Sequence, residues 1–182
     1  IEDFTKLLLG LDYAEFLTDK EDEIEEFILS FIRERVAQRI ATITKRHDII
    51  DAVVNSNTSS VPEQLKAAKV LSAVSESEEF KGITEALNRV INISAKAKDD
   101  ASGEILEDRL ETESERNLVK AIQELNAKVG SLTPEELYSH LEAMAPKIND
   151  FFNENMVMVD DEATRRNRLR FLGLLSQIIL DF

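Results

Sequence analysis

The stretch FFNENMVMVDDEATRRNRLRFLGLL, residues 151–175, decides the expected fold. Its acidic triplet at residues 160–162 indicates a helix start, because Asp160 or Asp161 can accept hydrogen bonds from the first N–H groups of a helix. Apolar residues then recur every three or four positions, which predicts an amphipathic helix. The stripe consists of Leu169, Leu172, Leu175 and Ile179, widened by Phe171, Leu174 and Ile178. Other helices must cover a side this apolar.

The composition favours a helical protein. The 182 residues are 43% hydrophobic and include only 5 Gly and 3 Pro, which argues against a turn-rich β architecture. The absence of Cys excludes a disulfide framework and thiolate zinc sites. No apolar run is long enough to span a membrane. A net charge of -14 argues against non-specific nucleic-acid binding, so any such binding must rest on local basic patches.

The periodicity predicts an all-α helical bundle of about seven to eight helices. We expect one subdomain over residues 1–100 and a second over 101–182, with one continuous bundle as the alternative; since the chain runs from Ile1 to an apolar end at Phe182, we also expect a piece of a longer protein. Helices are expected over residues 1–17, 19–47, 48–54, 61–74, 80–97, 113–129, 133–155 (broken or kinked at Pro146) and from 160 onward, with partial helix at 104–110 and a mobile loop at 98–103.

The early helix changes from apolar to basic along one line. Its stripe of Ile24, Phe27, Ile28, Phe31 and Ile32 continues, at 100° per residue, into Arg35, Arg39 and Arg46. Two interpretations remain open. The arginines lie at the edge of the core, where they extend to water or pair with acids, or they form a stripe that faces phosphates.

Catalytic chemistry has no visible signature in this chain. The two histidines, His47 and His140, are far apart in sequence, and the glycines form no phosphate-binding loop. The acid-rich segments, including residues 111–115, are interpreted as solvated helix starts, since none has the alternating oxygen ligands of a calcium loop. No catalytic residue and no metal site are therefore predicted. Pattern alone indicates an all-α binding or assembly module.

Three stretches resemble the carboxy-terminal region of the β subunit of bacterial heterotetrameric glycyl-tRNA synthetases. Residues 151–169 match the family pattern FFD-x-VMVM-x-DDEALR-x-NRL without gaps, departing at Asn153, Asn155 and Thr164. The other two stretches are residues 31–53, which contain DIIDAV where the family has DVIDAV, and residues 86–93. The tetrapeptide EATR at residues 162–165 is similar to the signature of the DALR-type anticodon-binding domain, shared with arginyl- and cysteinyl-tRNA synthetases.

The resemblance implies a helical module that holds the anticodon arm of glycine tRNA and supports ATP-dependent attachment of glycine. It implies a segment that is itself non-catalytic and holds no cofactor, within a ligase that uses ATP and Mg. It also implies an α subunit that carries the active site, an α2β2 assembly, a cytoplasmic location, and no membrane or DNA partner.

Arginine is the expected RNA-contacting residue, because its planar fork can bind a phosphate or stack on a base. The candidates are Arg165, Arg166, Arg168 and Arg170 on the last helix and Arg35, Arg39, Lys45 and Arg46 on the early one. Arg166 and Arg170 are i, i+4 neighbours that we expect to be exposed, which makes them the preferred contacts. Arg165 and Arg168 share a face with the buried stripe, and the alternative for both is an inward ion pair with Asp48 or Asp51.

Several other residues are expected to be structural. Asn167 is predicted to bond a neighbouring backbone carbonyl in the interior rather than a base. Phe151 and Phe152 are predicted core residues, and Met156 and Met158 are predicted packing residues. Three functions remain in competition: an RNA-binding module of a ligase, a docking module that does not touch RNA, and an unrelated helical scaffold.

Overall fold

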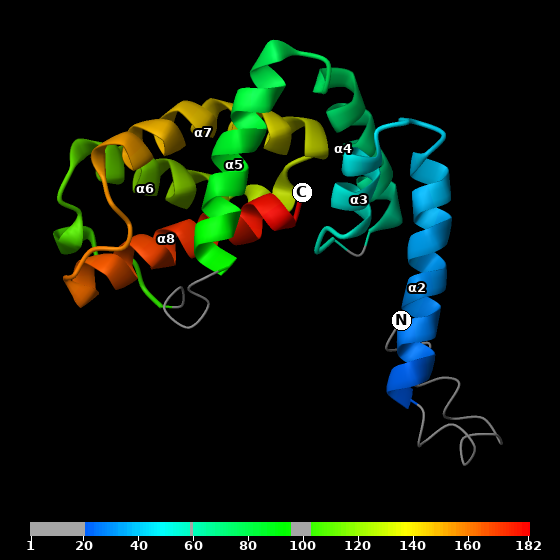
Figure 1. Cartoon of the computed structure of the whole chain (residues 1–182), viewed down its shortest axis with the longest axis horizontal. Coiled ribbons are helices and arrows are strands. Elements are labelled where there is room, and N and C mark those ends of the chain that lie inside the picture. The colour runs from blue at the N-terminus through cyan, green and yellow to red at the C-terminus, as the bar shows by residue number, and fades with distance from the viewer. Residues whose placement is uncertain (1–20, 59, 96–102) are drawn as a thin grey trace.

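A computed structural model describes residues 21–58, 60–95 and 103–182, and the described residues form seven α-helices and no strand. Figure 1 shows their arrangement. The helices are α2 Glu21–Ile40, α3 His47–Val54, α4 Val61–Val74, α5 Glu78–Ala95, α6 Glu113–Asn126, α7 Pro134–Glu154 and α8 Glu162–Leu180, with 3-10 turns at Glu107–Arg109 and Val129–Ser131. The prediction of an all-α bundle is confirmed.

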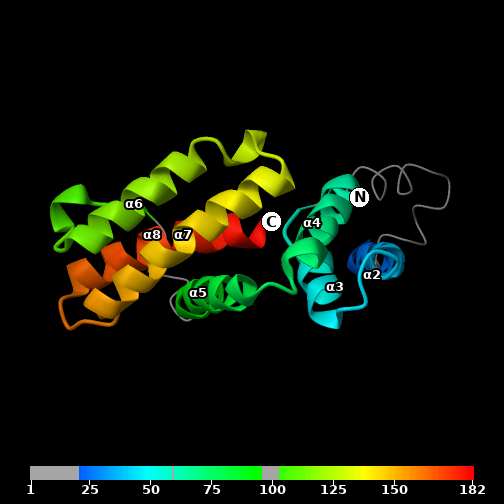
Figure 2. The same cartoon turned by 90° about the horizontal axis from the view of Figure 1, so that it is seen from above.

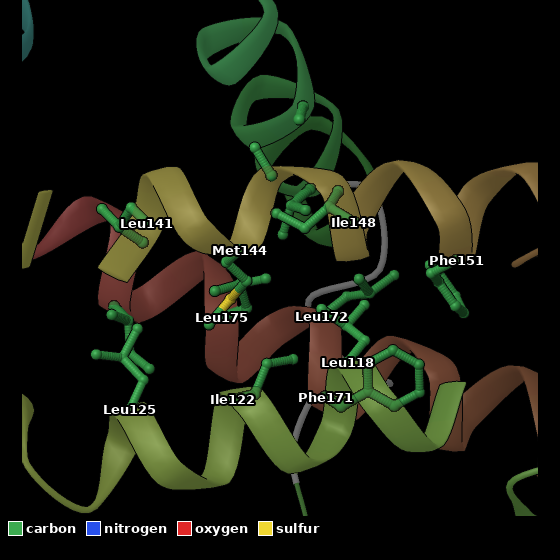
Figure 3. Close-up of a cluster of buried hydrophobic side chains, with 14 of the residues drawn as sticks. Leu118, Ile122, Leu125, Leu141, Met144, Ile148, Phe151, Phe171, Leu172 and Leu175 are labelled. Atoms are coloured by element: carbon green, nitrogen blue, oxygen red, sulfur yellow. The ribbon is translucent and has the colours of Figure 1, made fainter. Parts of the chain in front are cut away.

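The main core lies around α7 and α8. Seen from above in Figure 2, these two helices lie between α6 on one side and α5 on the other. Figure 3 shows how α6, α7 and α8 direct their apolar side chains into the space between them. The ring of Phe151 has no exposed surface and packs edge-on against Phe152 and Phe171, with centroids 5.1 and 5.3 Å away. The predicted core position of Phe151 and Phe152 is therefore confirmed.

A second, smaller core joins α2, α3 and α4. It contains Val36, Ile40, Ile49, Ile50, Val53, Ala67 and Ala68. Leu71 on α4 and Phe182 after α8 pack against both cores and connect them. The predicted subdomain boundary near residue 100 stays a prediction.

Local capping explains where three of the helices begin. Thr112 and Glu115 form a reciprocal capping box at the start of α6, and Thr133 and Glu136 form another at α7. At α8, the Asp161 carboxylate accepts a 2.8 Å hydrogen bond from the Thr164 N–H. Each cap satisfies N–H groups that have no partner within the helix, which stabilises the first turn.

One predicted helix limit is wrong, and the break that was one alternative at Pro146 does not occur. The early helix ends at Ile40 rather than near residue 47, and Arg46 occupies the position before α3. The Thr42 hydroxyl donates to the Arg39 carbonyl at 2.8 Å, a local bond of the kind that competes with helix continuation. By contrast, α7 continues through Pro146, which lies on the exposed side of the helix and leaves the core undisturbed.

Some predictions fall outside the described residues. These are the helix at residues 1–17 and all but the last residue of the loop at 98–103. Within the described part of the chain, no helix combines the length and apolar character needed to cross a membrane.

Candidate nucleic-acid interface

Arg168 lies in the interior, at the centre of a polar network. Its Nε donates to the Glu115 carboxylate at 2.5 Å and its Nη2 to Glu111 at 2.9 Å. The side chains of Arg168 and Glu115 are only 5% and 1% exposed. Glu115 also accepts hydrogen bonds from the backbone N–H groups of Glu111 and Thr112, at 2.6 and 3.0 Å. Charge and hydrogen-bonding capacity are therefore satisfied within the protein, which removes Arg168 from contact with RNA.

The same network holds the loop between α7 and α8. Arg168 Nη1 donates to the Met156 carbonyl at 2.8 Å. Asn155 is buried, donates to the Ser114 hydroxyl at 3.0 Å and accepts from the Thr112 hydroxyl at 3.1 Å. The start of α6 is thus tied to the end of α7. Asn155 is one of the positions at which the chain departs from the family pattern, where valine is expected.

Two expectations about this region are wrong. Arg168 points inward as the alternative held, but its partners are Glu115 and Glu111 rather than Asp48 or Asp51. Glu115 is fully buried, whereas residues 111–115 were expected to be solvated. The capping-box spacing of Thr112 and Glu115 is the sequence signal that could have identified a fixed carboxylate here.

Met156 and Met158 were expected to pack inside, and both are largely exposed, at 73% and 65%. Val157 between them is buried. The chain bends at Val157 and Met158, and the buried side chain lies between two exposed ones. The two methionines therefore form an exposed apolar pair. Its chain neighbours are acidic: Glu154, Asp160, Asp161 and Glu162, all exposed.

Asn167 occupies the interior position that was predicted for it. Its amide donates to the Leu106 carbonyl at 2.9 Å and accepts from the Leu106 N–H at 2.7 Å. This pair of bonds fastens the segment before α6 to the middle of α8. Asn167 thus fastens two parts of the fold together, and with 1% of its surface exposed it is inaccessible to a base.

The other arginines of α8 differ in exposure. Arg166 is exposed as expected and forms an ion pair with Glu162 one turn earlier, at 2.5 Å. The expected exposure of Arg170 is wrong, because this side chain is half-buried and donates to the Glu104 carbonyl at 3.0 Å. Arg165 is also half-buried and donates to the Val159 carbonyl at 3.1 Å. Of the four, Arg166 presents the most accessible charge.

The cap of α8 is electrostatically coupled to these cations. Hydrogen bonds from the side chain and backbone of Thr164 lower the pKa of the Asp161 carboxyl, and the charges of Arg109 and Arg165 add to this effect. The carboxylate therefore remains ionised well below neutral pH, as a cap at the positive end of a helix should.

Arg46 is held by several partners in the early part of the chain. It pairs with Asp48 at 2.5 Å, donates to the Ser75 carbonyl at 2.8 Å and lies 5.6 Å from the centre of the Phe80 ring. The hydrogen bond from Arg46 lowers the pKa of Asp48, and the same bond raises the pKa of Arg46. Arg46 therefore fits the first interpretation, in which an arginine at the edge of the core pairs with an acid.

Arg35, Arg39 and Lys45 are exposed. Arg35 donates to the Gln38 side chain at 3.2 Å, and its guanidinium lies 5.0 Å from the centre of the Phe31 ring. Lys45 donates to the Ala41 carbonyl at 2.9 Å. The exposure of Arg35 and Arg39 fits both interpretations, since side chains that extend to water and side chains that face phosphates are both exposed, and their role in RNA binding stays a prediction.

The early and late cations do not come together into one patch. In Figures 1 and 2, α2 lies at one end of the molecule and the amino-terminal half of α8 at the other. An RNA that binds these cations must therefore contact only one end of the molecule or be large enough to reach both ends.

Comparison with known proteins identifies the domain family of this chain. A family model for the DALR anticodon binding domain matches residues 83–181, which comprise α6, α7, α8 and most of α5. The chain belongs to this family.

Comparison with full-length proteins gives a more specific similarity than the domain match. The chain is 35% identical to the glycine–tRNA ligase beta subunit of Lactobacillus acidophilus over 87% of its length, and 39% identical to that of Streptococcus pyogenes over 80%. The corresponding protein of Shouchella clausii is 32% identical over 92% of the chain. The matched regions cover 23%, 21% and 24% of these three relatives, so the chain spans less than a quarter of the length of each.

Proposed function

We propose that this chain is part of the β subunit of a glycine–tRNA ligase and binds the anticodon arm of glycine tRNA. The observation that carries the proposal is the DALR anticodon binding domain match over residues 83–181, in a chain whose relatives are glycine–tRNA ligase beta subunits. In this proposal the whole enzyme, with ATP and magnesium, attaches glycine to the tRNA in the cytoplasm. An α subunit carries the reaction in an α2β2 assembly.

The physical basis is the chemistry of the anticodon loop. Its unstacked bases and dense phosphates are recognised by stacking surfaces, hydrogen-bond donors and cations. Four of the eight candidate cations are exposed: Arg35, Arg39, Lys45 and Arg166. Arg168 has its charge neutralised in the interior. The remaining three candidates, Arg46, Arg165 and Arg170, are half-buried and have partners within the protein.

The experiment measures binding of the chain to in vitro transcribed glycine tRNA and to the same tRNA with altered anticodon bases, each at two salt concentrations. We expect salt-dependent binding, because phosphate neutralisation releases counterions, and weaker binding to the altered anticodon. Equal affinity for both RNAs would contradict anticodon reading. Absence of binding to either would contradict the proposed function.

A docking function is the second candidate, and the exposed Met156–Met158 pair favours it. Methionine suits an adaptable protein contact, and an acidic surround fits a basic partner surface. The test is co-purification of the α subunit with a β subunit carrying Met156→Ser and Met158→Ser. Loss of co-purification with unchanged tRNA binding would establish a docking role for the loop. Unchanged co-purification would exclude it.

A further inference from the structure

One side of α2 is exposed although it carries two aromatic residues. Phe27 and Phe31 are 71% and 50% exposed. The residues of α2 that pack into the smaller core, Val36 and Ile40, lie on roughly the opposite side of the helix at 100° per residue. Figure 1 shows the amino-terminal half of α2 extending past α3 and α4. Of the apolar stripe predicted from periodicity, Ile32 packs against the smaller core, whereas Phe27 and Phe31 are exposed.

The exposed side combines aromatic and cationic groups. Phe27, Phe31, Arg35 and Arg39 follow one another at i, i+4 spacing, and we call these four residues the α2 stripe. They span about 18 Å along the helix. The Arg35 guanidinium already lies 5.0 Å from the centre of the Phe31 ring. The intervening acid, Glu34, lies about 60° around the helix from Phe31, at the margin of the stripe.

Charge is segregated along the chain in a way that favours this end for RNA. Residues 30–75 contain seven Lys and Arg against four Asp and Glu, a net charge of +3 in a chain of net charge -14. Residues 83–181, the part matched by the family model, contain 12 against 19, a net charge of -7. The acidic start of α2 lies before this window, and residues 21–74, which span α2, α3 and α4, contain seven Lys and Arg against nine Asp and Glu, a net charge of -2. A polyanion therefore meets less repulsion at the carboxy-terminal part of α2, at α3 and at α4 than at the helices of the matched domain.

We propose that the α2 stripe binds unstacked nucleotides of the same RNA, as a contact outside the DALR-matching helices; this rests on the proposed function. Bases stack on Phe27 and Phe31, and Arg39 binds a phosphate. Arg35 serves both tasks, since a guanidinium plane can lie between an aromatic ring and a base or turn to a phosphate. Aromatic rings that stack on bases, together with cations that bind the backbone, favour single-stranded nucleic acid, and such binding depends little on base sequence.

A protein partner for the same stripe would need acidic groups opposite Arg35 and Arg39 and an apolar surface opposite the rings. The local positive charge of residues 30–75 favours the polyanion, and the experiment separates the two.

The experiment uses the full chain and glycine tRNA, with three variants. Phe31→Ala removes a stacking ring, and Arg35→Glu with Arg39→Glu reverses two charges. The matched control, Lys120→Glu with Lys128→Glu, makes the same charge change at exposed positions at and just after α6. Because the altered side chains are exposed, urea unfolding of each variant is expected to match that of the unaltered chain.

We expect Phe31→Ala to weaken tRNA binding about 10-fold with an unchanged salt slope, since stacking releases no counterions. The arginine double variant is expected to weaken binding by a larger factor and to reduce the slope of log affinity against log salt by about 1.4, or 0.7 per phosphate. The control is expected to lower affinity less than 3-fold.

Two outcomes overturn the inference alone. If the unaltered chain binds tRNA and the α2 variants bind like the control, the stripe does not contact RNA. If the variants retain tRNA binding and lose association with the α subunit, the stripe is a protein surface. Failure of the unaltered chain to bind tRNA is a distinct result, because it overturns the proposed function and this inference together.

Discussion

At the scale of single residues, burial decides what each arginine can do. Arg166 and Arg168 are two positions apart on α8, and each pairs with a glutamate. The first pair is open to water, whereas the second is almost completely shielded from it. Breaking the buried pair is therefore expected to cost more stability than breaking the exposed pair, because water cannot solvate the charge that is left in the interior.

Replacing Arg168 with Met is expected to lower the free energy of unfolding by about 3–5 kcal/mol, since Glu115 is left as an unpaired buried charge. Urea denaturation followed by circular dichroism measures the change. The matched control is Arg166→Met on the same helix, expected to cost about 1 kcal/mol or less. Comparable losses for the two variants would show that the network around Arg168 is not protected from water.

At the scale of elements, the helix starts are specified by side chains three residues apart. Thr112, Thr133 and Asp161 each accept from the backbone N–H three positions on, and each lies before an apolar periodic run. The end of α2 and the continuity of α7 at Pro146 are not specified by such short-range side-chain pairs. Both depend on competing hydrogen bonds or on which side of a helix faces solvent, so the sequence pattern alone did not determine them.

Asp161→Ala is expected to lower the free energy of unfolding by about 1 kcal/mol at pH 7. Hydrogen bonding lowers the pKa of Asp161 below its ordinary value of 3.8. Its contribution is therefore present above about pH 4 and disappears as pH falls through the lower pKa of the folded state. Urea midpoints of both proteins at pH 7 and near pH 2.5 test this, with Asp160→Ala as the control. A difference between variant and unaltered protein that persists undiminished at the acidic pH would contradict the assignment.

At the scale of the whole molecule, two cores are joined by few side chains, and charge is divided between them. Leu71 on α4 packs against both cores. The positive excess lies in residues 30–75, around the smaller core, and the negative excess in residues 83–181. The smaller unit is thus less acidic than the larger one, with its positive excess confined to residues 30–75, and its orientation depends on the junction.

Leu71→Ala is expected to cost about 2 kcal/mol, because the residue is half-buried and a cavity opens between the cores. Amide hydrogen exchange is the measurement. We expect protection to fall more in α3 and α4 than in α6 and α8, since the smaller core relies more on the junction. Leu125→Ala in the main core is the control, with the opposite order expected. Uniform loss of protection across all helices would show that the two cores unfold as one unit.

The sequence by itself determined most of the helices, the acidic start of α8, the core positions of Phe151 and Phe152, and the internal role of Asn167. These depend on period and on neighbours within one turn, which the chain order displays directly. Tertiary structure alone decided the partner of Arg168, which lies 53 residues away, and the exposure of Met156 and Met158. It also decided which side of α2 is buried. An apolar stripe shows that a surface favours burial, but only the packing of other elements determines whether something covers it.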